Sequence, residues 1–189
     1  LTWWESSPIK PKSQITLRHL LSMTSGLGEH LCNNDPSDTT MSCAEKIHDE
    51  SFGVLRETGR VAGLGPVAAG VNPQTVSPGT HFCYSSSGFT VAAAIVEAVT
   101  GVSIRDRYEE DFQPQDTNQY SGWTWPSDTN PLYAGGLVIS PQDYGKILGA
   151  YFYESLISRA SMDEMEKPQT FLYQAQFLDM APENEQYGL

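Results

Sequence analysis

The segment from Ser77 to Gly101, SPGTHFCYSSSGFTVAAAIVEAVTG, constrains the fold more than any other part of the chain. Pro78-Gly79 indicates a turn, because proline presets φ and glycine accepts a positive φ. Beyond Gly88 the apolar residues recur at intervals of three and four, which predicts a helix of about three turns. The run from Ala92 to Val96 is apolar on every side, so we expect the helix to be buried. Gly101 stands where a left-handed C-terminal cap is needed.

The polar run in front of this helix contains the candidate chemistry. Tyr84 and the hydroxyls of Ser85, Ser86 and Ser87 precede the helix N-terminus, where unpaired N–H groups and the helix dipole favour negative charge. Serines at this position are usually helix caps, and a tyrosine that ends a strand usually contributes to packing. From the residues alone, a catalytic and a purely structural interpretation both stay open.

Three stretches of the chain, in order, resemble the serine β-lactamase-like family of class C β-lactamases, D-Ala-D-Ala carboxypeptidases and related esterases. PGTHFCYSSSGFTVAAAIVEAVTG is similar to the family's PGT-x-F-x-YSN-x-G-Y…E-x-VTG segment. Residues 15–27, ITLRHLLSMTSGL, are similar to its ITIRHLLTHTSGL, and residues 134–148, AGGLVISPQDYGKIL, to its AGGL-x-ST-x-x-DL-x-x-F. The last three residues, YGL, resemble the start of its YGLGW strand.

The resemblance implies an α+β fold, of which this chain would form the helix-rich lobe of the β-lactamase/transpeptidase-like architecture with most of the sheet missing. Residues 1–189 would then be a single partial domain, truncated at both ends. The implied reaction is acyl transfer: a serine attacks the carbonyl of an ester, a β-lactam or a D-alanyl peptide, and an acyl-serine forms and is then released.

By the same resemblance, Tyr84 exchanges protons with the nucleophile and the leaving group, and Ser86 is a substrate-binding residue at the position of the motif's asparagine. Serine is shorter than asparagine and lacks the amide's paired donor and acceptor. This departure weakens the case for β-lactam or peptide recognition and leaves ester hydrolysis open. It also supports the alternative, a catalytically inactive module that keeps the fold for binding or assembly. In a third possibility, a partner chain supplies the missing motifs.

The family's other catalytic motifs are not found in a usable form. Ser7-Pro8-Ile9-Lys10 matches Ser-x-x-Lys formally, but Pro8 and Pro11 forbid the buried helix that the motif requires. No Lys-x-Gly or His-x-Gly follows Tyr84. We therefore interpret the chain as the middle of an enzyme, without its nucleophile, lysine and third motif.

Composition excludes several functions. The 189 residues suffice for one domain. The net charge of -12, from 11 basic and 23 acidic residues, argues against nucleic acid and anionic membranes as partners. There is no run of eighteen apolar residues and no zinc-type spacing of cysteine and histidine. We expect a small-molecule acyl substrate, no cofactor, no metal and an extracytoplasmic or secreted location, with the oligomeric state left open.

Cysteines and cap signals give the remaining expectations. Cys32 and Cys43 flank a polar loop and could form a disulfide in an oxidising compartment, or stay reduced; Cys83 is expected to be a small buried hydrophobe.

His19 is expected to be structural, and the aromatic loop 115–133 is expected to cover the core or line a cleft. Helices are predicted from Thr16 to Gly26, from the capping box of Ser42 and Glu45 to about Glu57, and after Ser103, Ser140 and Ser161. Inward faces are predicted for Phe89, Ala93, Val96 and Val99, and for Tyr144, Ile147, Leu148, Tyr151 and Phe152.

Overall fold

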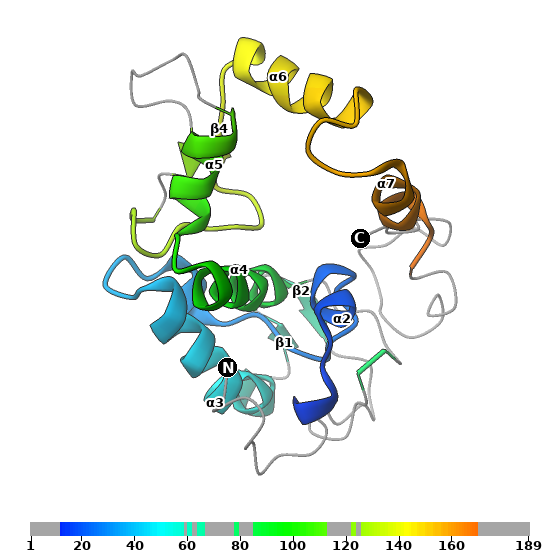
Figure 1. Cartoon of the computed structure of the whole chain (residues 1–189). Helices are drawn as coiled ribbons and strands as arrows, with labels where there is room; N and C mark the ends of the chain where they lie inside the picture. Colours follow the sequence, from blue (N-terminus) through cyan, green and yellow to red (C-terminus); the bar gives the residue numbers. More distant parts are fainter. Residues whose placement is uncertain are drawn as a thin grey trace.

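The computed structural model describes residues 12–58, 60–61, 64–66, 78–79, 85–112, 122–123 and 126–169. Helices dominate this part of the chain (Figure 1): α2 (Leu17–Leu21), α3 (Thr40–Thr58), α4 (Ser87–Thr100), α5 (Ile104–Phe112), α6 (Pro141–Phe152) and α7 (Arg159–Glu166), with the 3-10 turns η1 (Lys12–Gln14) and η2 (Leu31–Asn34). The strands form two antiparallel pairs, β1 (Arg60–Val61) with β2 (Leu64–Pro66) and β3 (Gly122–Trp123) with β4 (Leu137–Val138). The expectation of a helix-rich lobe with little sheet is confirmed.

Most of the predicted helix ends are confirmed, each by a specific cap. The Thr16 hydroxyl accepts a hydrogen bond from the His19 N–H, and His19 Nδ1 accepts one from the Thr16 N–H. The Ser140 hydroxyl accepts from the Asp143 N–H at 3.1 Å, with Pro141 in the first helical position. Gly101 ends α4 in the left-handed conformation, with φ of 70°.

Three helix boundaries differ from the prediction. Helix α3 begins at Thr40 because Thr39 is the cap: Thr39 and Ser42 exchange hydrogen bonds between backbone N–H and hydroxyl, so Ser42 lies in the first turn. Helix α7 begins at Arg159, because the Ser158 hydroxyl accepts from the Ser161 N–H. Helix α2 ends at Leu21, before Gly26. For α3 and α7, a hydroxyl three residues before the predicted cap takes the capping role.

The core lies where α2, α3 and α4 meet. Leu20 of α2, Ala44 and Ile47 of α3, and Val91 and Ala94 of α4 are buried there. Ala93 is also buried, as predicted, while Phe89 and Val96 are only half-buried. The prediction for Val99 is wrong: its side chain is 80% exposed, because the last turn of α4 extends beyond the core.

Helices α2 and α4 cross in close contact at Gly88. A Cβ atom on Gly88 would lie 2.6 Å from the carbonyl oxygen of Leu20, a distance that real Cβ atoms do not adopt. The glycine is therefore required by the packing, since its backbone φ is an ordinary helical one and needs no special residue.

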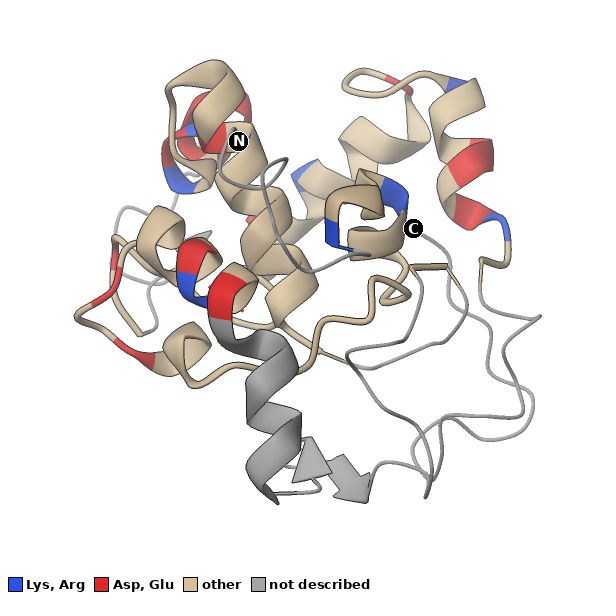
Figure 2. Ribbon diagram, turned by 90° about the horizontal axis from the view of Figure 1, so that it is seen from below, with Lys and Arg blue, Asp and Glu red and all other residues tan. Residues whose placement is uncertain are grey.

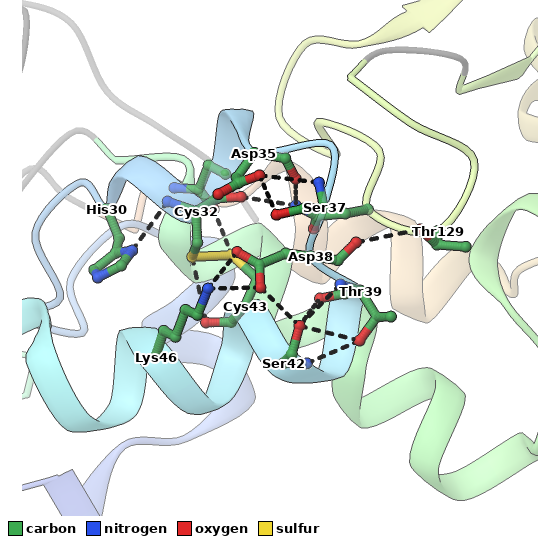
Figure 3. A network of polar contacts seen from close by, with 12 residues as sticks. His30, Cys32, Asp35, Ser37, Asp38, Thr39, Ser42, Cys43, Lys46 and Thr129 are labelled. Atoms are coloured by element: carbon green, nitrogen blue, oxygen red, sulfur yellow. Dashed lines mark hydrogen bonds and ion pairs between the residues drawn. A yellow bond between two sulfur atoms is a disulfide. The ribbon is translucent and has the colours of Figure 1, made fainter.

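Cys32 and Cys43 form a disulfide that joins η2 to α3, and both residues are buried. This decides the question that the sequence left open. Figure 3 shows the bond among polar contacts of the same loop, in which Lys46 Nζ lies 2.7 and 2.8 Å from the carboxylate oxygens of Asp38. Cys83 lies outside the described residues.

Helix α6 lies away from the α2–α3–α4 core, and α7 returns toward α2 (Figure 1), where Arg18 pairs with Glu164. An apolar face of α6 is left exposed. Tyr144 is 49% exposed, Leu148 39% and Phe152 73%, so the prediction that they form a buried stripe is wrong. Ile147 and Tyr151 are half-buried. The predicted helix is confirmed, but in the described part of the chain too little structure packs against this face to cover it.

Charged residues of the two signs are interleaved over the described surface (Figure 2). Several are paired, as in Arg18 with Glu164 and Arg107 with Asp111. Within the described residues no single helix has the length and apolar character to cross a membrane; α4 and α5 would pass the same test only as a pair, and they meet at a bend of 73°.

The α2–α4 crossing predicts a specific loss of stability. Gly88→Ala should destabilise the fold by about 1–3 kcal/mol, because the added methyl meets a backbone carbonyl that cannot move aside alone. Gly149→Ala on α6 is the matched control: nothing lies within 4 Å of its Cβ position, and the better helix propensity of alanine should stabilise α6 by about 0.5–1 kcal/mol. Urea unfolding of the three proteins checks this, and equal midpoints for Gly88→Ala and wild type would contradict it.

The open apolar face predicts self-association of the isolated 189-residue chain. Exposed patches of this kind favour association in water, so the chain should sediment with an apparent mass that rises with concentration. Replacing Leu148 and Phe152 together by Ser should reduce that rise. A wild-type chain that stays monomeric and shows a sharp, reversible thermal transition would contradict the prediction.

Candidate active site at the N-terminus of α4

The serine run lies at the start of α4, as the sequence predicted. Ser86 is the cap residue, with φ of −73° and ψ of −22°, and Ser87 is the first helical residue. The carbonyl oxygen of Ser86 accepts hydrogen bonds from the N–H groups of Phe89 and Thr90. Tyr84, the proposed proton-exchanging residue, lies outside the described residues, and its role stays a prediction.

The three serine hydroxyls of the run differ in their hydrogen bonds and in their exposure. The Ser85 hydroxyl accepts a hydrogen bond from the Ser87 N–H at 3.1 Å, and the Ser87 hydroxyl accepts one from Asn33 Nδ2 at 3.1 Å; both side chains are buried. Ser86 is partly exposed, and its side chain makes no cap hydrogen bond. The usual interpretation of such serines as caps and packing therefore fits Ser85 and Ser87, whereas Ser86 has a hydroxyl that can still bind a ligand.

Glu29 and Asn33, from the segment between α2 and α3, form hydrogen bonds with this run. One carboxylate oxygen of Glu29 accepts a hydrogen bond from the Ser86 N–H at 2.5 Å, and the other accepts one from Asn33 Nδ2 at 2.6 Å. Asn33 Oδ1 in turn accepts from the Thr90 hydroxyl at 2.7 Å. A carboxylate at this point compensates unpaired donors and the positive end of the helix dipole. Sequence analysis missed both residues, because a Glu and an Asn four positions apart in a polar loop match no motif.

The turn before the serine run contacts α2 and the segment that follows it. The Gly79 N–H donates to the Thr24 carbonyl at 2.8 Å, and Gly79 has a positive φ of 79°, which explains the Pro-Gly signal. A Cβ on Gly79 would lie 2.9 Å from His19 Nε2, so the imidazole packs directly on the turn. Burial, and then the charge of Arg18, lower the pKa of His19. A neutral imidazole fits its place in the Thr16 cap, where Nδ1 accepts a hydrogen bond.

A buried lysine lies elsewhere in the structure. Burial lowers the pKa of Lys12 to about 8, and the negative charge of Asp49 opposes this fall. Asp49 belongs to α3. The formal match Ser7-Pro8-Ile9-Lys10, which the sequence analysis rejected, lies outside the described residues.

A hollow of about 470 Å³ opens at the other end of α4. Glu97, which lines it, is about 16 Å along the helix from Ser86 at a rise of about 1.5 Å per residue. Its walls are charged and internally paired: Arg105 lies 2.7 Å from Asp128 and 3.3 Å from Glu109. Within the described residues no three metal-binding side chains lie close enough together to hold an ion.

The aromatic loop contributes one side chain to this region that the structure describes. The Tyr133 hydroxyl lies 2.7 Å from the Thr40 hydroxyl and donates to Glu97 at 3.2 Å, and burial raises its pKa above the ordinary value for a phenol. Tyr133 thus joins α3 to α4. Tyr120, Trp123 and Trp125 have side chains outside the described part of the chain, so the question whether they line a cleft stays open.

A family model and several solved structures match this chain. The family model described as beta-lactamase matches residues 2–182. Among solved structures, a D-amino acid amidase from Ochrobactrum anthropi SV3 is 23% identical, with a TM-score of 0.53 over 88% of this chain and 54% of that one. A suspected β-lactamase from Bacteroides dorei is 19% identical, with a TM-score of 0.59 over 92% and 48%. A D-stereospecific amidohydrolase from Streptomyces sp. is 21% identical, with a TM-score of 0.51 over 99% and 60%.

These matches cover most of this chain but only part of the others. The chain spans about half the length of the solved structures it matches. No curated protein matches it.

Proposed function

This chain belongs to the β-lactamase family, and on that basis we propose that the protein containing it is a serine hydrolase that works through an acyl-serine intermediate. The substrate classes are an ester, a β-lactam or a D-alanyl peptide. The observation that supports this most is the state of Ser86: it caps a buried helix at the family's motif position, is partly exposed, and uses its hydroxyl for no cap.

The proposed roles follow the chemistry of acyl transfer. A serine oxygen attacks the substrate carbonyl and loses its proton, and the bond from the carbonyl carbon to the leaving group breaks as the leaving group gains a proton. Water later hydrolyses the acyl-serine ester and releases the acid. Tyr84 carries the proton from the serine oxygen to the leaving group, whose accepting atom is an oxygen in an ester and a nitrogen in a β-lactam or peptide. A phenol titrates near pH 10, so Tyr84 needs a neighbouring cation to act at neutral pH. The family's nucleophile and lysine would come from residues outside this chain.

Ser86 is the proposed substrate contact. Its hydroxyl can donate one hydrogen bond and accept others, but it cannot reach the two separate partners of an asparagine amide. This favours substrates that need one contact here, and so favours esters. Two of the similar structures are named for D-amino acid amide or D-stereospecific hydrolysis, which supports the inclusion of D-configured amides among the test substrates.

A catalytically inactive binding or assembly module is the second candidate. The observation that favours it is again Ser86, because the motif's asparagine is absent. The two candidates separate on turnover alone: the hydrolase requires a Tyr84-dependent rate, and the module requires none.

We also propose an extracytoplasmic or secreted location. The buried Cys32–Cys43 disulfide supports it, since such bonds persist in oxidising compartments.

The hydrolase proposal predicts a large effect of Tyr84→Phe in the full-length protein. Turnover of p-nitrophenyl acetate, a chromogenic cephalosporin or D-phenylalanine amide should fall by about 10²–10⁴-fold, the usual worth of positioned acid–base assistance. Circular dichroism and melting temperature should stay as in wild type. Tyr144→Phe is the matched control, because it removes the same hydroxyl from an exposed tyrosine on α6 and should leave turnover unchanged.

Two results would contradict this proposal. Equal activity of wild type and Tyr84→Phe would remove Tyr84 from the mechanism. Failure of the wild-type full-length protein to hydrolyse any of these three substrates would favour the inactive module.

A further inference from the structure

The side chain of Glu29 contacts the backbone of the serine run. Its carboxylate holds the Ser86 N–H at 2.5 Å, and this N–H belongs to the peptide bond between Ser85 and Ser86, next to Tyr84 in sequence. Hydrogen bonds to an ionised acceptor are shorter and stronger than neutral ones. The contact therefore fixes the backbone between the two residues to which the proposed function gives a role.

Asn33 holds the carboxylate and the helix in one arrangement. It is 1% exposed, and its amide has a partner on each side: Nδ2 donates to Glu29 Oε1 at 2.6 Å and to the Ser87 hydroxyl at 3.1 Å, and Oδ1 accepts from the Thr90 hydroxyl. These partners determine the orientation of the amide, because a flipped amide would place Oδ1, an acceptor, against the carboxylate oxygen of Glu29. A buried network in which every group is satisfied rigidifies its surroundings.

A disulfide anchors the end of this network at Asn33. Asn33 follows Cys32, whose disulfide ties η2 to Cys43 on α3. The Asn130 amide also donates to the Cys32 carbonyl oxygen at 2.7 Å. The contacts thus run from α3 through the disulfide, Asn33 and Glu29 to the start of α4.

We propose that Glu29 and Asn33 are positioning residues, which hold the Ser85–Ser86–Ser87 backbone so that the Ser86 hydroxyl and Tyr84 present themselves to substrate. The proposal rests on the proposed hydrolase function. Neither residue touches the reacting atoms; Glu29 acts through the Ser86 N–H, and Asn33 acts through Glu29 and Ser87.

Glu29→Gln in the full-length protein is the test, because it keeps the shape of the side chain and removes one acceptor. The Gln amide can accept from Ser86 or from Asn33, but not from both. The expected result is a fall in kcat/KM for p-nitrophenyl acetate of about 10- to 100-fold, the order that a small misplacement of catalytic groups costs. If the variant does not fold, Glu29→Asp replaces it: the charge stays, the reach is one methylene shorter, and the same fall is expected.

Asp38→Asn is the matched control. Asp38 lies in the same loop, is buried, and loses its charge by the same exchange of oxygen for amide, but its partners Ser42 and Lys46 lie on α3 (Figure 3). It should lower the melting temperature by at least as much as Glu29→Gln and leave kcat/KM unchanged. Equal losses of activity in the two variants would show a merely structural role and overturn the proposal.

Two further measurements separate positioning from stability. Hydrogen–deuterium exchange of the peptide spanning Ser85 to Thr90 should become at least about tenfold faster in Glu29→Gln and stay unchanged in Asp38→Asn. In the Tyr84→Phe background, Glu29→Gln should cost much less than it costs in wild type, because residues that act as a unit are not additive. Additive losses would overturn the proposal.

The outcomes for the two proposals are distinguishable. If Glu29→Gln exchanges at the wild-type rate, Glu29 does not hold the Ser85–Ser87 backbone, and the proposal is overturned whether or not the protein is an enzyme. Faster exchange with unchanged kcat/KM would overturn the positioning role of Glu29. A wild-type protein without turnover would refute the hydrolase function, and with it the positioning role of Glu29 and Asn33 in catalysis.

Discussion

The close crossing of α2 and α4 at Gly88 is the contact on which the rest of the structure depends. The Leu20 carbonyl oxygen lies where a Cβ would stand, so the two helices approach as closely as backbones can. That approach buries Leu20 with Val91 and brings the loop after α2 beside the first turn of α4. From there Glu29 and Asn33 reach the serine run. A side chain at residue 88 would separate both the apolar contacts and the polar ones.

Local signals predicted the parts of the fold that local physics decides. Ser140-Pro141, Ser103 with Asp106, and Gly101 are at the helix ends expected, because a cap is satisfied by its own neighbours. Where Thr39 or Ser158 competed with a second hydroxyl three residues later, the sequence offered no way to choose. The exposure of Val99 and Phe152 could not be predicted from the spacing of apolar residues either. That spacing indicates which residues share a helix face, but it does not indicate which other elements pack against the face.

The candidate site was predictable only where a motif marks it. The resemblance located Tyr84 and Ser86, and the structure describes Ser86 at the cap of a buried helix. The network behind Ser86 comes from residues more than fifty positions away, and side-chain hydrogen bonds over that separation leave no periodic trace. The disulfide is similar: eleven positions separate Cys32 and Cys43, and their pairing depends on the fold that brings η2 to α3.

The proposed function requires that the Ser86 hydroxyl, which makes no cap hydrogen bond, faces the substrate. A crystal structure of the full-length protein with a boronic acid bound to its nucleophilic serine tests it most directly, because boronates mimic the tetrahedral intermediate of acyl transfer. We expect the Ser86 oxygen within about 3.2 Å of a polar atom of the adduct, with the Glu29 contact to the Ser86 N–H intact. An adduct remote from the start of α4, or a Ser86 hydroxyl turned into the protein, would contradict it.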